Sequence, residues 1–147
     1  MDREVLHKEI DLIQACITRM ANNSFLLKGW AISIIAVVLA LADKAANPAL
    51  LSTVLLIPLL SFWYLDAFFL RTEKMYRKMY EWVLEKRKNN DSTFLYDLNP
   101  NRFKDGVGSI REVMLSITLK CFYGIPVLLT LVVIFVRIAK VVLHKGA

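Results

Sequence analysis

The sequence predicts an all-α membrane protein with an N-terminal amphipathic helix, a transmembrane helical hairpin whose second helix extends into the cytoplasm, and a third transmembrane helix. Three apolar runs, each of about 14 to 21 residues without a charged side chain, predict this class. They lie between Lys28 and Asp43, Lys44 and Asp66, and Lys120 and Arg137. A bilayer core takes about 20 helical residues to cross, and backbone amides inside it must bond within helices. With 147 residues, 56% of them apolar, we expect a single membrane domain over 1–147.

The first element is expected at residues 1–22. Leu6, Ile10, Ile13, Ile17 and Met20 recur every three or four residues, which is typical of an amphipathic helix. Glu9, Asp11 and Arg19 are expected off that stripe. The polar triplet Asn22-Asn23-Ser24 should end this helix before a first span at 25–42, which Ser24 can cap.

The next elements are a turn and a long helix. The connection from Asp43 to Pro48 is short enough to force a helical hairpin, and Pro48 suits the first turn of the following helix. The second span is expected at 49–70, and no Gly or Pro interrupts residues 71–88. We therefore predict one helix of about 40 residues, or about 60 Å, whose second half is a cytoplasmic extension. Its stripe of Tyr76, Met79, Tyr80 and Val83 needs a partner.

The C-terminal third is predicted to contain a loop and a short span. Residues 89–108 collect Asn, Asp, Ser, Pro and Gly and indicate a loop, in which Phe94, Leu95, Tyr96 and Leu98 should pack against another element. Ser109 and Glu112 have the spacing of a capping box that opens the last helix. The third span, 118–140, has about 16 uncharged residues, or about 24 Å, and either crosses or is partly re-entrant.

The distribution of Lys and Arg predicts the orientation. Seven cations between Arg71 and Lys88 outweigh Lys44 in the hairpin turn, so the N-terminal helix and the extension should be cytoplasmic and the protein a multi-pass inner-membrane protein. A crossing third span would then leave Arg137 and Lys140 outside, against this tendency. Topology and anionic lipid account for the formal charge of +6 better than nucleic acid does, so no direct nucleic-acid partner is expected.

Two candidate sites lie in the spans. Lys28 and Asp66 are 18 residues before and 20 residues after the middle of the turn, so they should meet as an intramembrane ion pair. This pair either fixes the register of the hairpin or lines or gates a pore. Small residues at Gly29, Ser33, Ala36 and Ala40 form a helix-packing face on the first span. With the cytoplasmic stripe, this face favours a homo-oligomer over a monomer capped by the N-terminal helix.

The sequence offers no catalytic constellation. His7 and His144 lie at opposite ends of the chain, so no metal cluster or histidine-based triad is predicted. Cys16 and Cys121 are expected to be buried reduced thiols. We therefore expect no enzyme, no catalytic residue, no metal and no cofactor.

Three motifs carry a resemblance to a family. The segments NSFLLKGW at 23–30 and FWYLDAFFLR at 62–71, together with Phe122-Tyr-Gly124, resemble small bacterial multi-pass membrane proteins. Some of these are similar to accessory transmembrane proteins of antiphage defence loci, including type VI-B CRISPR and RADAR adenosine-deaminase systems. The resemblance implies an oligomeric accessory or effector protein that perturbs the inner membrane. The alternative is a passive membrane anchor or scaffold that recruits a cytosolic defence enzyme, and the resemblance supplies no catalytic residue.

Overall fold

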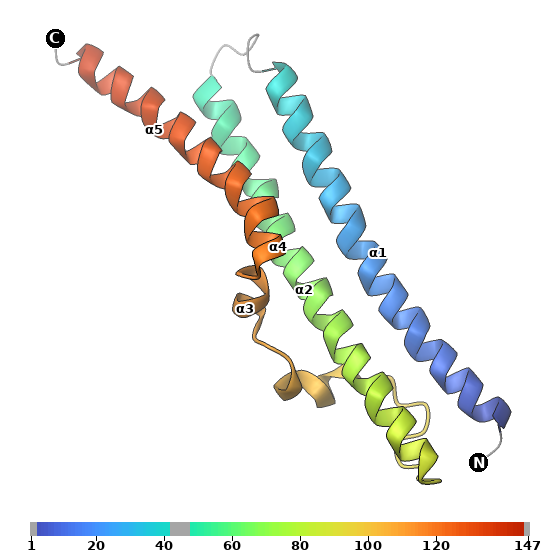
Figure 1. The fold of residues 1–147 in the computed structure, drawn as a ribbon. Helices are drawn as coiled ribbons and strands as arrows, with labels where there is room; N and C mark the ends of the chain where they lie inside the picture. The colour runs from blue at the N-terminus through green and yellow to red at the C-terminus, as the bar shows by residue number, and fades with distance from the viewer. Residues whose placement is uncertain (1–2, 42–47, 146–147) are drawn as a thin grey trace. The chain divides into compact units, whose positions relative to one another are not determined.

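The computed structural model describes residues 3–41 and 48–145, and within them the chain is helical and contains no strand (Figure 1). The long helices are α1 (Arg3–Leu41), α2 (Pro48–Lys88) and α5 (Ile125–Lys145). Shorter elements are the 3₁₀ helix η1 (Pro100–Gly106), α3 (Ile110–Met114), α4 (Ile117–Leu119) and the π-helical turn η2 (Lys120–Gly124). Three helical stretches are long and apolar enough to cross a membrane, namely Arg3–Leu41, Leu50–Lys88 and Ile117–Lys140. The predicted all-α membrane class is confirmed at this level.

The chain divides into two compact units. Unit 1 comprises Met1–Phe25 with Ala67–Val113, and unit 2 comprises Leu26–Asp66 with Met114–Ala147. Both α1 and α2 therefore contribute to both units. The predicted hairpin turn at 43–47 lies outside the described residues.

Helix α1 corrects the expected boundary between the amphipathic helix and the first span. It runs without a break from Arg3 to Leu41 and passes through Asn22, Asn23 and Ser24. Asn and Ser cost only a few tenths of a kcal/mol each inside a helix, and no Gly or Pro accompanies them. Ser24 is also buried, so packing favours the helical conformation there. Ser24 is consequently an interior residue of α1 and caps no helix.

Helix α2 confirms the prediction of one long helix. It has 41 residues and begins at Pro48, where the missing N–H is not needed. Pro58 lies inside it. The helix ends in a Schellman motif, in which the amides of Asn90 and Asp91 donate to the carbonyls of Arg87 and Lys86, each at 3.1 Å. Asn90 adopts the left-handed conformation of this motif, with φ of 55°.

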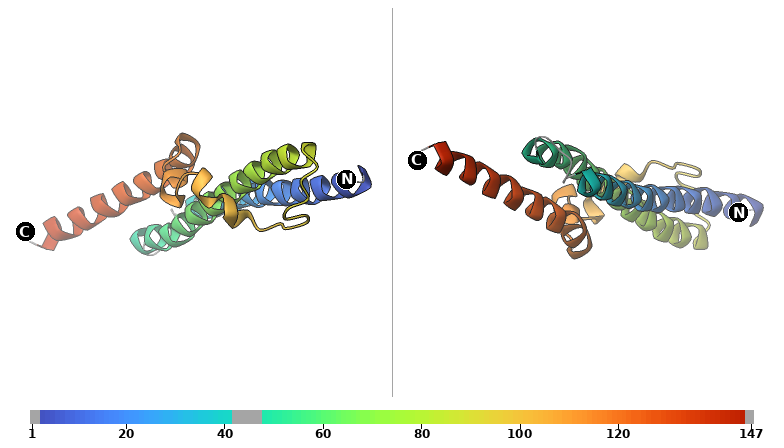
Figure 2. Two further views of the ribbon diagram at one scale, coloured as in Figure 1. Left: turned by 90° about the horizontal axis from the view of Figure 1, so that it is seen from below. Right: turned by 90° about the horizontal axis from the view of Figure 1, so that it is seen from above.

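The core of unit 1 covers the stripe that was expected to need a partner molecule. Ile13 of α1 packs with Tyr76, Met79 and Val83 of α2, and all four side chains are buried. Figure 2 shows the N-terminal half of α1 beside the C-terminal half of α2. Partly buried neighbours complete the cluster: Cys16, Ile17, Met20, Tyr80, Trp82, Leu98 and Phe103. The chain's own N-terminal residues thus cover this stripe, since α1 carries its apolar positions on the facing side, and only Tyr80 keeps substantial exposure.

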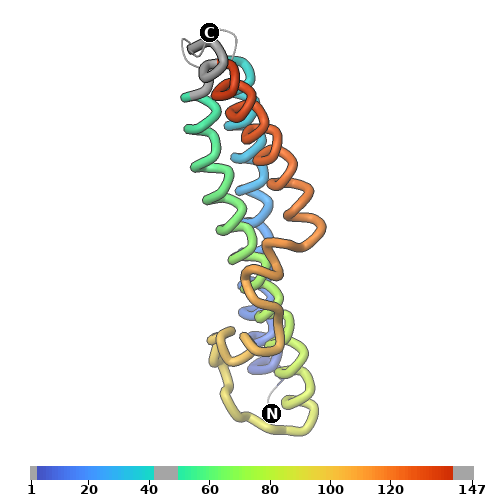
Figure 3. The backbone as a smooth tube through the Cα atoms, turned by 90° about the vertical axis from the view of Figure 1, so that its left-hand side faces the viewer, coloured from blue at the N-terminus to red at the C-terminus, as the bar shows by residue number. Residues whose placement is uncertain are grey.

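The segment after α2 turns back along that helix (Figure 3). The predicted loop at 89–108 includes η1, whose first turn is capped by Asn99 accepting from the amide of Asn101 at 3.1 Å. Leu98 packs on the core as expected. Phe94 and Tyr96 also contact other elements, since the Phe94 ring lies 6.3 Å from that of Trp82 on α2 and the Tyr96 hydroxyl donates to the carbonyl of Val5 on α1 at 3.4 Å. Phe94, Leu95 and Tyr96 nevertheless keep 54%, 36% and 40% of their surface exposed.

The C-terminal helix is interrupted where a continuous helix was expected. Ser109 accepts a hydrogen bond from the amide of Glu112 at 3.3 Å, so the predicted cap is present, but it opens only the five residues of α3. The chain leaves the helix after Met114 and then passes through α4 and η2 into α5. Pro126 has no N–H for the carbonyl four residues earlier, at Phe122. The π turn η2, which is wider than an α-helical turn, lies directly before Pro126. The hydrogen bond from residue 126 to the carbonyl of Phe122, which proline cannot make, is therefore not needed there.

Candidate functional site: a buried ion pair in the apolar unit

Unit 2 brings together one residue from each of its three helical segments. Lys28 of α1 places Nζ 2.6 Å from Oδ2 of Asp66 on α2. The hydroxyl of Tyr123, in η2, donates to the same oxygen at 3.1 Å. Asp66 and Tyr123 are fully buried, whereas 23% of the Lys28 side chain is exposed. The expected pairing of Lys28 with Asp66 is therefore present, and we name these two residues together with Tyr123 the ion-pair cluster.

The ring of Tyr123 is held in place by aromatic packing and by a hydrogen bond that fixes its neighbour Trp63. Its ring stacks on Trp63, with centroids 6.3 Å apart and planes 14° apart, and meets Phe122 edge-on at 4.8 Å. Nε1 of Trp63 donates to the carbonyl of Met114 at 2.9 Å. That carbonyl ends α3 and has no partner within its helix. Trp63 therefore fixes both the tyrosine ring and the start of the third apolar segment.

Sequence reasoning missed Tyr123, although its motif was singled out. A tyrosine in an apolar run resembles an interfacial aromatic residue, and only the π turn shows which way it faces. Single π turns inside α-helices are frequent at functional sites. Here the turn brings a third polar group to a carboxylate that a dry environment would otherwise penalise.

The cluster is suited to holding helices together. Its carboxylate accepts two donors from two other segments, and its opposite charges compensate each other. No group of three His, Cys, Asp or Glu side chains among the described residues could hold a metal ion. The arrangement therefore connects α1, α2 and η2 through one shared carboxylate.

Other hydroxyls in the apolar segments bond their own helices. Ser33 donates to the carbonyl of Gly29 at 2.9 Å, and Ser61 to that of Ile57 at 2.8 Å. Thr130 donates to the carbonyl of Pro126 at 2.7 Å. Such bonds to the preceding turn satisfy hydroxyls without water. Because these three hydroxyls are bonded to their own helices, we do not count them as the lining of a polar path.

The predicted helix-packing face is open. Gly29, Ser33, Ala36 and Ala40 are all exposed, and a Cβ added at Gly29 would meet nothing within 4 Å in the described part of the chain. Ala31, on another side of α1, is completely buried. The small residues thus lie on a side of α1 that remains accessible to lipid or to another helix.

Unit 1 contains a second buried ion pair, which sequence reasoning did not anticipate. Nε and Nη2 of Arg87 donate to the two carboxylate oxygens of Glu9, both at 2.8 Å, and 1% and 2% of the two side chains are exposed. Arg87 also donates to the carbonyls of Asp91 and, at 3.2 Å, Thr93. The amide of Tyr96 donates to Glu9 at 3.1 Å. One guanidinium therefore connects α1, α2 and the loop after α2.

Glu9 was expected on the polar side of its helix, and the structure corrects this. It is four residues before the buried Ile13, so it shares the inward face. Burial raises the pKa of Glu9, but the hydrogen bonds from Arg87 and Tyr96 outweigh it and hold the pKa below its ordinary value. Hydrogen bonds from Thr93, with Lys86 nearby, likewise hold the pKa of Asp91 well below its usual range. Both carboxylates therefore stay ionised near neutral pH.

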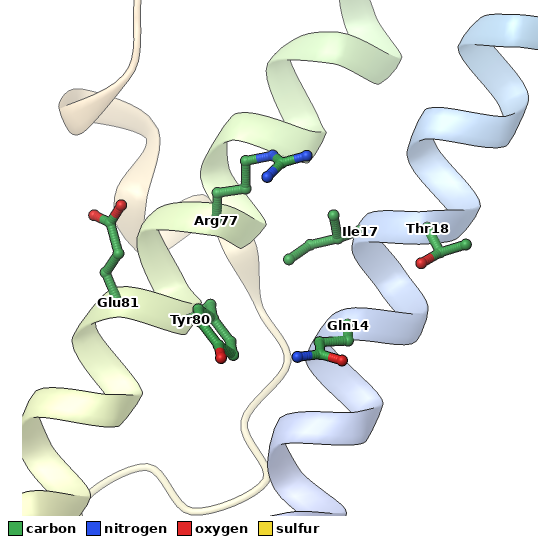
Figure 4. Close-up of a pocket in the computed structure, with 6 residues that line it drawn as sticks. All are labelled: Gln14, Ile17, Thr18, Arg77, Tyr80 and Glu81. Atoms are coloured by element: carbon green, nitrogen blue, oxygen red, sulfur yellow. The ribbon is translucent and has the colours of Figure 1, made fainter.

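A groove of about 440 Å³ lies between α1 and α2 in unit 1 (Figure 4). Gln14 and Ile17 face Arg77 and Tyr80 across it, whereas Glu81 points to the other side of α2. Arg77 is engaged by Glu73 at 2.7 Å. The groove offers no reactive pair of side chains, and it contributes no further candidate site.

Comparisons with known protein families, with curated proteins and with solved structures find no match for this chain.

Proposed function

We propose that this chain is a multi-pass protein of the bacterial inner membrane that anchors unit 1 at the cytoplasmic surface. There it serves antiphage defence as an accessory subunit that recruits a cytosolic enzyme. The observation that carries the anchor role is the ion-pair cluster, in which Lys28 and Tyr123 both contact the buried Asp66 carboxylate within one copy. The defence setting comes from the resemblance of the sequence motifs alone.

The charge pattern supports the orientation in this proposal. Seven Lys and Arg residues between Arg71 and Lys88 follow the second apolar run, and such excesses favour the cytoplasmic side. In the proposed topology, α1 and α2 form a transmembrane hairpin and the stretch Ile117–Lys140 is a third crossing. Unit 1 is then tethered because α1 and α2 contribute to both units.

Unit 1 has features of a binding module. It has its own core around Ile13 and Met79, and a buried ion pair at Glu9 and Arg87. A segment that served only as a spacer would need neither. Phe94, Leu95 and Tyr96 keep part of their surface exposed on this scaffold, and Phe94 and Tyr96 both have φ of 58°. Left-handed backbone is unfavourable for aromatic residues and is often retained at functional sites.

A second candidate function is membrane perturbation by a homo-oligomer. The observation that favours it is the open face of Gly29, Ser33, Ala36 and Ala40, because small residues let transmembrane helices approach closely. In this case several copies would have to assemble a polar path that one copy lacks.

Two measurements separate the candidates. For the anchor we expect purified protein to add no conductance to a planar bilayer, and the enzyme of the same locus to move to the membrane fraction on co-expression. Conductance above the lipid background would favour the second candidate. Gly29→Leu with Ser33→Leu should then abolish both conductance and cross-linked oligomers, whereas Ile32→Leu, at an exposed apolar neighbour, should preserve them.

Cysteine labelling tests the topology. In a variant with Cys16 and Cys121 replaced by serine, a cysteine at position 46 should react with an impermeant reagent added outside the cell. A cysteine at position 88 should react only after the membrane is opened. The reverse pattern would overturn the orientation.

A further inference from the structure

Unit 1 has a groove of about 360 Å³ with strongly cationic lining. Lys74, Arg77 and Lys78 of α2 form one wall, and Gly106–Gly108 form the other. Glu81 is the only carboxylate among the residues that line it. Three cations against one anion make the groove suited to a negatively charged ligand.

The second wall is fixed in place. Nε of Arg71 donates to the carbonyl of Gly108 at 3.0 Å, and its Nη2 donates to that of Lys104 at 3.3 Å. A Cβ at Gly108 would lie 2.6 Å from Oε2 of Glu112, so Gly108 packs closely against that side chain. The segment from Lys104 to Gly108 is thus held against α2, and the groove is a built feature of the fold.

The cations in the groove have only exchangeable partners. Arg77 contacts Glu73 at 2.7 Å with 61% of its side chain exposed. Lys78 contacts Glu81 at 3.1 Å, with exposures of 52% and 65%. Exposed pairs of this kind are weak, so an incoming anion can replace them. Lys74 is exposed and forms no ion pair within 3–41 and 48–145.

The position of these cations along α2 points to the source of the anion. Lys74 and Lys78 follow Leu70, the last residue of the second span predicted at 49–70, by four and eight residues, or about 6 and 12 Å along the helix. A headgroup layer is about 5 to 7 Å thick on each side of the hydrocarbon core. The groove therefore begins at the depth of the lipid phosphates.

We propose that this groove binds the phosphate headgroup of an anionic phospholipid in the membrane that α2 enters. Lys and Arg side chains make strong charge-assisted hydrogen bonds to phosphate oxygens, and basic juxtamembrane residues attract anionic lipids. The inference rests on the proposed membrane placement of α2. It adds a specific lipid site to the anchor role, at the surface of unit 1.

The test measures the affinity of the full chain for phosphatidylglycerol by native mass spectrometry in phosphatidylcholine-like detergent micelles. Lys74→Gln with Lys78→Gln removes two cations from the groove. Lys8→Gln with Lys88→Gln is the matched control, because both lysines are exposed and lie outside the groove. We expect about fivefold weaker binding per groove lysine removed, hence more than tenfold for the pair, and a change below twofold for the control.

Three outcomes would overturn the proposal. Unchanged affinity in the groove variant would exclude the site. Equal losses in the groove and control variants would show attraction by net charge only. Competition by millimolar inorganic phosphate would show a site for a soluble anion. The micelle measurement does not depend on topology, so reversed labelling at position 46 would defeat the proposed anchor while leaving the lipid affinity readable.

Discussion

The buried pair of Glu9 and Arg87 should dominate the stability of unit 1, and Arg87→Met tests this. The substitution keeps an apolar side chain of similar length but removes both donors to the Glu9 carboxylate. It also removes the donors to the carbonyls of Asp91 and Thr93. Glu9 would retain only the amide of Tyr96 among these partners. A carboxylate that is 1% exposed would then be left without its cation.

The expected cost follows from this geometry. Removing one member of a buried ion pair typically costs about 3 to 5 kcal/mol, because the other charge stays buried and uncompensated. Arg77→Met is the matched control, since Arg77 pairs with Glu73 on the surface, where such pairs contribute about 0 to 1 kcal/mol. The double variant Glu9→Leu with Arg87→Met should recover part of the loss because neither charge remains.

Hydrogen exchange followed by mass spectrometry measures this loss of stability peptide by peptide. Peptides covering 5–13 and 86–99 should exchange at least about a hundredfold faster in Arg87→Met, as expected for about 3 to 5 kcal/mol of lost opening energy. Peptides covering 117–135 serve as an internal reference in unit 2. If Arg87→Met and Arg77→Met exchange alike, the pair is not a stabilising element and the reasoning fails.

Three further predictions concern pH, the ion-pair cluster and a glycine. Glu9 has a folded-state pKa below its ordinary 4.5, so the folded chain binds fewer protons than the unfolded chain, and stability should fall as the pH drops below about 4.5. Thermal unfolding against pH measures this, and an unchanged acid limb in Glu9→Gln would refute the role of Glu9. Lys28→Met should cost up to about 3 kcal/mol, because the buried Asp66 carboxylate loses its cation but keeps the hydroxyl of Tyr123, and Lys28 itself is partly exposed. The swap of Lys28→Asp with Asp66→Lys should recover part of the loss in detergent-resistance assays, and a swap no better than the sum of its single changes would contradict the pairing. Gly108→Ala should push Glu112 away and weaken the Ser109 cap by up to about 1 kcal/mol, seen as faster exchange in 109–115, and unchanged exchange there would show that the carboxylate moves freely.

The apolar runs and their flanking charges were sufficient to predict the fold class. A run of about 20 uncharged residues has few alternatives to a membrane helix, and the absence of Gly and Pro from 71–88 predicted the length of α2. The pairing of Lys28 with Asp66 could also be predicted, because two antiparallel helices joined by a short turn bring residues equally far from that turn to the same level.

The sequence pattern did not predict where the helices are interrupted or which surface covers the apolar stripe on α2. The triplet at 22–24 contains residues that often cap helices, yet the chain stays helical there, because tertiary packing outweighs a weak local preference. The stripe at Tyr76, Met79 and Val83 was correctly identified as apolar, but periodicity does not say which surface covers it, and Ile13 of the same chain does.

The sequence by itself determined that the fold is all-helical, which segments are apolar enough to enter a membrane and where the cations accumulate. The tertiary structure alone decided that Tyr123 reaches Asp66, that Arg87 is buried on Glu9 and that Lys74 and Lys78 face a wall of Gly106–Gly108. The physical reason is the range of the interactions. Helix formation and membrane entry depend on neighbours within a few residues, whereas each of these contacts joins groups about 30 to 80 positions apart, and their energy exists only when the chain has folded.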